Sequence, residues 1–197
     1  MFDFDKSFTI FLDNFDLFWY GTKITIILAL VGTIAGLIIG LLFGAIRATT
    51  IDIKDKKIIV LIKKALKIIS EIYIWFFRGT PMIVQAMVIY YGAMEAFNID
   101  MAPFTAGLFV VSINTGAYMS EIVRGGILSV DRGQFEASKI LGLSKWFTFK
   151  KIILPQSFKK TLPSIANEVI TLVKDTSLVY VVGIGELLRA GKIASNR

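Results

Sequence analysis

The sequence predicts an all-α fold, a polytopic helical bundle that crosses a lipid bilayer. Of the 197 residues, 55% are hydrophobic and 16 are Phe, a composition that differs strongly from that of soluble domains. The hydrophobic residues form long runs, and Lys and Arg gather in two segments between those runs. Because basic loops face the cytoplasm, this alternation predicts about four spans. We expect residues 1–197 to form a single transmembrane domain.

Two residue types are absent, and their absence excludes several classes of site. The chain has no Cys and no His, which excludes disulfides, Cys- or His-ligated metal sites, and a Ser-His triad. No metal site or lipidation motif is evident. The net charge of +7 fits basic loops on one side of a membrane, so we expect no nucleic-acid partner.

The N-terminal segment is acidic and precedes the clearest span. Residues 1–19 contain four Asp against a single Lys, so we expect this end to lie outside the cell. Ile24 to Ile46 carry no charge and would form a helix of about 34 Å, enough to cross the hydrocarbon core. Within it, a Gly recurs at every fourth position, which predicts a ridge for close packing of a second helix. These residues are Gly32, Gly36, Gly40 and Gly44.

The first basic segment, residues 47–67, is predicted to be cytoplasmic. It holds Arg47 and six Lys against Asp52 and Asp55, and its apolar residues suggest a helix in the membrane interface. A second crossing ends near Phe97. Because Thr80 can cap a helix and Pro81 can open one, we expect this crossing to be broken at 78–81. The acidic loop at 98–101 is placed outside.

The third span begins at Pro103, returns inward to about Val123, and carries a polar stripe. Asn114, Tyr118 and Glu121 follow each other at helical spacing on one face. Lipid cannot satisfy these groups, so the face is expected to look into the bundle or a water-filled path.

The fourth span is predicted from Pro163 to about Ile184, although charges interrupt it. A charge near mid-bilayer costs about 2.5 to 3.5 kcal/mol, so these side chains should face protein or water. Two interpretations stay open: Lys174 and Asp175 lock the bundle by pairing with other helices, or the helix lines the path of a zwitterionic substrate. The substrate-path candidates are Gln85, Asn114, Tyr118, Glu121, Glu168, Thr171, Lys174 and Asp175.

A polar helical hairpin is predicted in the second basic loop, residues 125–160. The periodicity of the segment from Glu136 predicts a helix of about two turns that stops at Gly142. Ser144 can cap a second helix, which Pro155 should end. Glu136 is expected at the positive end of the first helix dipole.

This hairpin resembles the cytoplasmic-loop signature of permease subunits of binding-protein-dependent ABC importers. The match is carried by Glu136, Ala137, Gly142, Ile152, Leu154 and Pro155, with Ser138 where the family usually has Ala. The resemblance implies that the first helix is a coupling helix seated on a separate ATPase subunit. It places the coupling contact in residues Gln134, Glu136, Ala137, Ser138, Leu141, Gly142 and Ser144.

Further motifs resemble the polar amino-acid branch of these permeases. They are Arg-Gly-Thr-Pro at 78–81, the run from Ser112 to Gly125, and Lys-Asp-Thr-Ser-Leu at 174–178. The resemblance implies a second permease subunit, identical or a sister chain, an extracytoplasmic substrate-binding protein, and membrane lipid around the bundle. ATP and Mg²⁺ belong to the partner ATPase. This chain has no phosphate-binding loop, since Gly185 to Ile193 has the wrong spacing, so we expect no enzyme activity and no cofactor in it.

The C-terminal end departs from the family pattern. Relatives continue into a fifth span after a segment like residues 188–195, whereas this sequence stops at Arg197. We therefore expect the chain to be truncated; otherwise residues 185–197 lie outside and the bundle lacks one of its packing partners. An alternative function is an ion-coupled secondary transporter or channel without an ATPase, which the charges at Glu168, Lys174 and Asp175 would suit.

Overall fold

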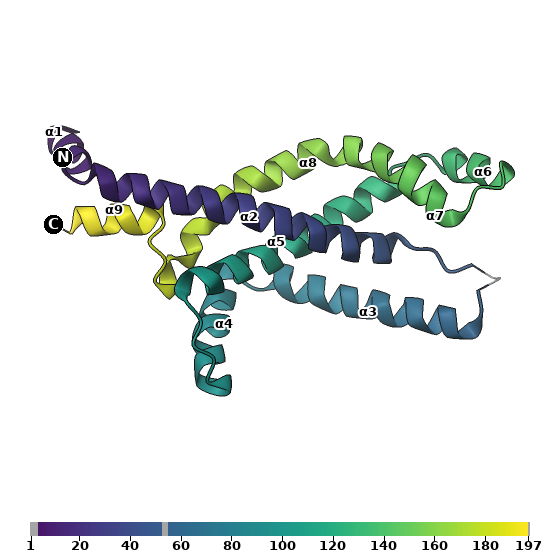
Figure 1. Ribbon diagram of the computed structural model, residues 1–197, viewed down its shortest axis with the longest axis horizontal. Helices are drawn as coiled ribbons and strands as arrows, with labels where there is room; N and C mark the ends of the chain where they lie inside the picture. The colour runs from purple at the N-terminus through teal and green to yellow at the C-terminus, as the bar shows by residue number, and fades with distance from the viewer. Residues whose placement is uncertain (1–3, 53–54, 197) are drawn as a thin grey trace. The chain divides into compact units, whose positions relative to one another are not determined.

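The computed structural model describes residues 4–52 and 55–196, and all regular elements in these ranges are helical (Figure 1). The α-helices are α1 (Phe4–Asp13), α2 (Phe15–Ala48), α3 (Lys57–Gly79), α4 (Met82–Phe97), α5 (Pro103–Leu128), α6 (Arg132–Ile140), α7 (Lys145–Thr148), α8 (Leu154–Asp175) and α9 (Leu187–Ser195). A π-helical turn, Phe149–Ile153, joins α7 to α8, and a 3₁₀ segment, Thr176–Val182, follows α8. The all-α prediction is confirmed. The charges counted at Asp3, Lys54 and Arg197 lie outside the described residues.

Two helices are long and apolar enough to cross a membrane, by length and composition. They are α2, which contains the predicted span 24–46 and extends beyond both of its ends, and α5, which begins at Pro103 as expected. Helix α4 is apolar but shorter. The predicted break is present, because α3 ends at Gly79 and α4 begins at Met82. The count of four spans stays a prediction.

Two proline-based boundaries and one predicted helix cap were wrong. Pro155 does not end the hairpin's second helix, because the Leu154 N–H donates to the Phe149 carbonyl in a π-helical turn and Pro155 follows within α8. Its missing N–H falls where the helix changes register. Pro163 lies inside α8 instead of opening a span, and the regular α-helix ends at Asp175. Thr80 does not cap α4; its hydroxyl accepts from the Gln85 side chain.

The residues fall into two compact units, each described by itself. The first comprises the described residues of 1–34, 80–112 and 169–197. Its core packs Leu28 of α2 with Val110 and Val111 of α5, Leu172 of α8 and Val179 of the 3₁₀ segment. A Cβ added at Gly32 would come within 2.5 Å of the Val111 side chain, so a glycine is needed for this approach.

The first unit also holds a buried carboxylate that the sequence analysis did not single out. Glu186 is almost completely buried and caps α9, its two oxygens accepting from the backbone N–H groups of Leu188 and Arg189 at 2.7 Å each. The Leu187 N–H donates to the Thr25 hydroxyl of α2 at 3.2 Å. These bonds satisfy the first N–H groups of α9 and join this helix to α2.

The second unit comprises the described residues of 35–79 and 113–168. Here the glycine ridge of α2 packs on α5, as predicted. A Cβ at Gly36 would lie 2.6 Å from the Thr115 side chain, and one at Gly40 would lie 2.5 Å from the Met119 Cβ. A smaller core follows toward the hairpin, formed by Val123, Ile127, Val130 and Ile153. That the two units form a single transmembrane domain stays a prediction.

Candidate coupling hairpin and polar pocket

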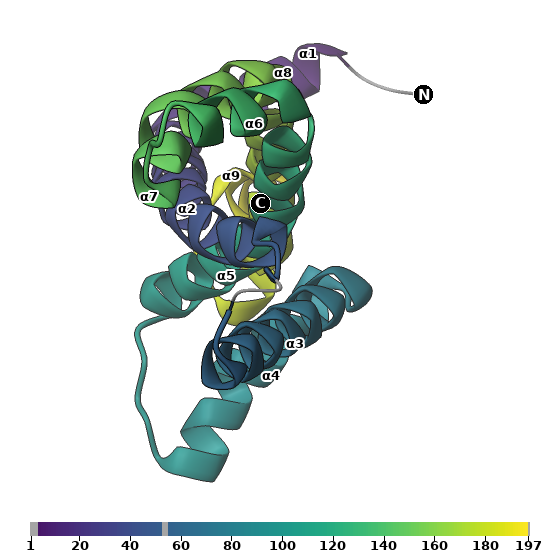
Figure 2. The ribbon, with the colours of Figure 1, turned by 90° about the vertical axis from the view of Figure 1, so that its right-hand side faces the viewer.

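The hairpin is formed by α6, a tight turn and α7, drawn in green in Figure 2. Asp131 caps α6, its carboxylate accepting from the Gly133 N–H at 2.6 Å. Gly142 adopts φ +68°, a left-handed conformation that glycine adopts without steric cost. Ser144 caps α7 by accepting from the Phe147 N–H at 3.2 Å. The predicted turn at Gly142 and the cap at Ser144 are therefore confirmed.

The predicted start of the first helix was wrong. Because α6 begins at Arg132, Glu136 lies in its middle, where the helix dipole stabilises a carboxylate little. Asp131 takes the position that was expected for Glu136. Asp131 could have been predicted as the cap, since Asp is a preferred residue at that position, but the family signature begins only at Glu136.

The hairpin leaves several large apolar side chains exposed. Ile140 and Leu141 are 86% and 73% exposed, and Trp146 beyond the turn is 69% exposed. Of the seven predicted coupling residues, Gln134, Glu136, Ala137, Leu141, Gly142 and Ser144 are exposed, and Ser138 is buried. Ser138 donates to the Gln134 carbonyl at 2.6 Å, so its place is inside the hairpin and not on the contact face.

Side-chain bonds hold the hairpin to the segments that flank it in sequence. Lys160 of α8 donates to the Ser129 carbonyl after α5 at 2.6 Å, and the Gln156 amide donates to the Gln134 side chain at 3.3 Å. Lys145 pairs with Asp52 in the first basic loop at 3.1 Å. The pair is exposed and therefore worth little in stability, but it links the two basic loops within this unit.

The polar stripe predicted on α5 meets partners within the second unit. Asn114 is buried and its amide donates to the Phe77 carbonyl of α3 at 3.2 Å. Tyr73 of α3 donates to the Ile113 carbonyl at 2.6 Å. Since such groups need partners away from water, these bonds explain why the stripe faces protein. The expectation that Asn114 looks into the bundle is confirmed.

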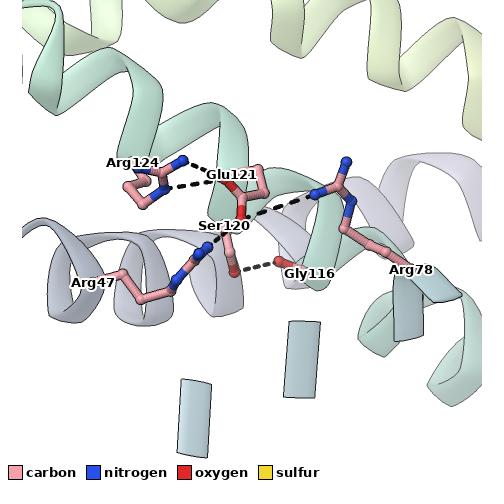
Figure 3. A network of polar contacts seen from close by, with 6 residues as sticks. All are labelled: Arg47, Arg78, Gly116, Ser120, Glu121 and Arg124. Carbon is pink, nitrogen blue, oxygen red and sulfur yellow. Dashed lines mark hydrogen bonds and ion pairs between the residues drawn. The ribbon is translucent and has the colours of Figure 1, made fainter. Parts of the chain in front are cut away.

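Glu121 lies in a group of three arginines (Figure 3). It pairs with Arg47 at the end of α2, and with Arg124 one turn further on, whose Nε and Nη2 lie 3.1 and 3.0 Å from Oε2. The Arg78 guanidinium at the end of α3 is more distant, at 3.9 Å, and lies over the Tyr118 ring at 5.2 Å. One carboxylate thus faces three guanidinium groups, so the group carries net positive charge.

A pocket of about 480 Å³ opens beside this group. Its lining includes Tyr118 and Glu121 from the predicted stripe, and adds Arg47, Glu71, Ile74, Trp75, Arg78 and Gly79. Glu71, Trp75 and Arg78 were not predicted as site residues, although they recur at i, i+4 and i+7 on one face of α3. Arg47 was predicted only as a basic residue of the first cytoplasmic loop.

The remaining candidates lie elsewhere. Gln85 is buried and its amide donates to both oxygens of Thr80, at 2.9 and 2.8 Å. On α8, Glu168 and Asp175 are half-buried, whereas Thr171 and Lys174 are exposed. Within residues 4–52 and 55–196, Lys174 and Asp175 form no ion pair with another helix, so the bundle-locking interpretation gains no support.

Known proteins resemble this chain over most of its length. The glutamine transport system permease protein GlnP of Escherichia coli strain K12 is 40% identical over 179 residues, covering 89% of this chain and 76% of that protein. A crystal structure of an amino acid ABC transporter with histidines is 32% identical with a TM-score of 0.82, covering 100% of this chain and 84% of that one. An inward-facing structure of the MetNI methionine ABC transporter, 20% identical with a TM-score of 0.74 over 92% of this chain and 83% of that one, shares the fold.

A family model matches the larger part of the sequence. It is the model of the binding-protein-dependent transport system inner membrane component, and it spans residues 36–197. The match includes α3, the hairpin and α8, as well as the part of α2 that carries Gly36, Gly40 and Gly44. This chain therefore belongs to the family of binding-protein-dependent transport system inner membrane components.

Proposed function

We propose that this chain is the transmembrane permease subunit of an ABC importer that moves polar amino acids across the cytoplasmic membrane. The observation that carries the proposal is the hairpin: a basic, polar segment that nevertheless exposes Ile140, Leu141 and Trp146. Several large apolar side chains exposed on one short polar element are typical of a protein interface. The GlnP relative and the structure of an amino acid transporter support the substrate class.

The partners follow from this role. A separate ATPase subunit binds the hairpin through the exposed members of the coupling set and supplies ATP hydrolysis with its own Mg²⁺. A second permease subunit, identical or a sister chain, completes the path, and an extracytoplasmic binding protein delivers the substrate. This chain itself carries no catalytic residue, cofactor or metal in the proposal. The ion-coupled alternative has no observation in its favour.

The transport cycle then rests on two states of the helices. Closure of the ATPases on ATP changes their contact with α6, and the hairpin transmits that change through Lys160 and Gln156 of α8 to the helices that line the path. A ligand-driven shift of this kind requires contacts that differ between the two states. The substrate-path residues proposed for this route are those named from the sequence, with Glu168, Thr171, Lys174 and Asp175 on α8.

Co-purification of the ATPase tests the coupling role. We expect Ile140→Ser to lower the amount of ATPase that co-purifies with the tagged permease about tenfold, because an apolar anchor at an interface is worth about 1–2 kcal/mol. Ile58→Ser is the matched control, since Ile58 is 66% exposed on α3, outside the hairpin. Equal recovery of the ATPase with the parent, Ile140→Ser and Ile58→Ser would contradict the coupling role.

A further inference from the structure

The pocket beside Glu121 contains one cation and one anion that form few or no bonds with other side chains of the described residues. Glu121 is occupied by Arg47 and Arg124. Arg78, by contrast, is 43% exposed, approaches Glu121 only to 3.9 Å, and retains most of its donors. Glu71 lines the same pocket, is exposed, and forms no hydrogen bond or ion pair within residues 4–52 and 55–196.

These two charges lie on the same helix face. Glu71 and Arg78 are seven residues apart on α3, so their backbones are separated by about 10 Å along the axis. Trp75 lies between them on that face and is 78% exposed. The Tyr118 ring, from α5, contacts the Arg78 guanidinium at 5.2 Å and holds it beside the pocket. Figure 3 shows Arg78 extended from the end of α3 toward Glu121.

We infer that this pocket is a binding site for a free α-amino acid, in which Arg78 binds the α-carboxylate and Glu71 binds the α-ammonium group. A guanidinium matches a carboxylate with two parallel N–H donors, and a carboxylate accepts from an ammonium group. Both charges of a zwitterion are then paired. The inference rests on the proposed function, and it assigns Glu71, Trp75 and Arg78 as substrate-binding residues. Arg78 opens the Arg-Gly-Thr-Pro motif, whereas Glu71 and Trp75 lie outside the motifs named from the sequence.

The remaining pocket residues suit the rest of such a ligand. A volume of about 480 Å³ exceeds that of one amino acid, so the pocket leaves room for a polar side chain and for water. Arg47, Arg124 and Glu121 neutralise one another in part and leave a positive excess, which favours the carboxylate end near Arg78. Trp75 and the buried Ile74 supply the apolar wall.

Binding of radiolabelled L-glutamine to the full chain in lipid nanodiscs tests the inference. We expect Arg78→Gln and Glu71→Gln each to weaken binding about tenfold or more, because each removes a charge-assisted bond. The amino alcohol of glutamine lacks the α-carboxylate, so Arg78→Gln should bind it with the same affinity as the parent. N-acetylglutamine lacks the α-ammonium group, so Glu71→Gln should bind it with the same affinity as the parent. This pairing of variant with analogue separates direct contacts from a general loss of folding.

Matched controls are available outside the pocket. Lys64→Gln removes an exposed cation from α3, and Glu95→Gln removes an exposed anion from α4; both should bind L-glutamine like the parent. Unchanged binding by Arg78→Gln and Glu71→Gln would overturn the inference, as would a parent chain that binds phosphatidylglycerol headgroups but no glutamine. ATPase co-purification from the same preparations separates the two proposals. If Arg78→Gln and Glu71→Gln retain both the ATPase and unchanged glutamine binding, only the pocket inference is refuted. If no ATPase co-purifies with the parent, the proposed function is refuted.

Discussion

At the scale of single residues, charge is arranged in compact groups whose members depend on one another. Glu121 compensates Arg47 and Arg124, so removal of that carboxylate would leave like charges together in a partly desolvated place. Asp55 compensates a basic residue in the same way in the first basic loop, where it pairs with Lys63. Its Oδ2 accepts from Lys63 at 2.6 Å and from the Asp52 N–H at 2.9 Å.

The Asp55 group predicts a pH dependence of stability. The hydrogen bond from Lys63, followed by that from the Asp52 backbone, lowers the pKa of Asp55 below its ordinary value of 3.8. A carboxylate with a depressed pKa in the folded state stabilises the fold above its unfolded pKa, and this contribution is lost as the pH falls through the folded pKa. We expect Asp55→Asn to lower the thermal midpoint at pH 7, with the difference from the parent shrinking below a pH of about 4.

Thermal unfolding in detergent at a series of pH values measures this difference. Lys63→Met is the matched variant, because it removes the same bond from the other side. It should show the same convergence at low pH. A difference between Asp55→Asn and the parent that stays constant from pH 7 to 3 would contradict a role for the ionised carboxylate.

How well single residues can be predicted depends on whether their role is local. Gly142 and Ser144 were predicted because a left-handed turn and a helix cap have signatures within a few residues. Glu71 and Arg78 were missed because their joint role appears only when α3 is placed beside α5. Glu186 was missed for another reason, since a buried carboxylate that caps a helix looks in the sequence like an ordinary charged residue.

At the scale of elements, the glycines of α2 let its backbone approach α5 closely within each unit. Between membrane helices, small residues give the van der Waals contact that apolar burial cannot provide, since lipid is equally apolar. The glycine ridge was predictable from its four-residue period. The course of α8 was not, because Pro155 and Pro163 usually break or open helices, yet a π-helical turn and the surrounding packing accommodate them.

The glycine ridge predicts a large loss of stability for a small change. At Gly40 an added Cβ would lie 2.5 Å from the Met119 Cβ and 2.8 Å from its backbone carbonyl carbon, which cannot move cheaply. We expect Gly40→Ala to destabilise the protein by about 1–3 kcal/mol, measured by thermal or denaturant unfolding in micelles. Gly92→Ala is the control, because its nearest neighbour would be the Val88 side chain at 3.9 Å.

The control should be neutral or slightly stabilising, since Ala is a better helix former than Gly by about 1 kcal/mol. Equal stability of Gly40→Ala and Gly92→Ala would mean that α2 and α5 do not pack through this ridge in the membrane. Loss of stability in both variants would point to a general intolerance of the helices instead.

At the scale of the whole molecule, charge asymmetry sets the expected orientation in the membrane. Residues 47–67 and 125–160 carry most of the basic side chains, whereas the first residues and the loop at 98–101 are acidic or nearly neutral. The positive-inside rule therefore places both basic segments in the cytoplasm and the N-terminus outside. Membrane location follows from the family and the apolar helices, while the orientation is a prediction from charge alone.

Cysteine labelling measures this orientation directly, because the parent chain has no Cys to react. We expect Thr9→Cys and Asp100→Cys to react with a membrane-impermeant maleimide in intact cells, since both positions are exposed outside the predicted spans. Lys139→Cys, exposed on α6, should react only after the membrane is permeabilised. Labelling of Lys139→Cys in intact cells would contradict a cytoplasmic hairpin, and with it the contact to an ATPase. Protection of Thr9→Cys together with labelling of Asp100→Cys would instead mean that an odd number of crossings, and not two, lies between these positions, and would leave the hairpin where it is proposed.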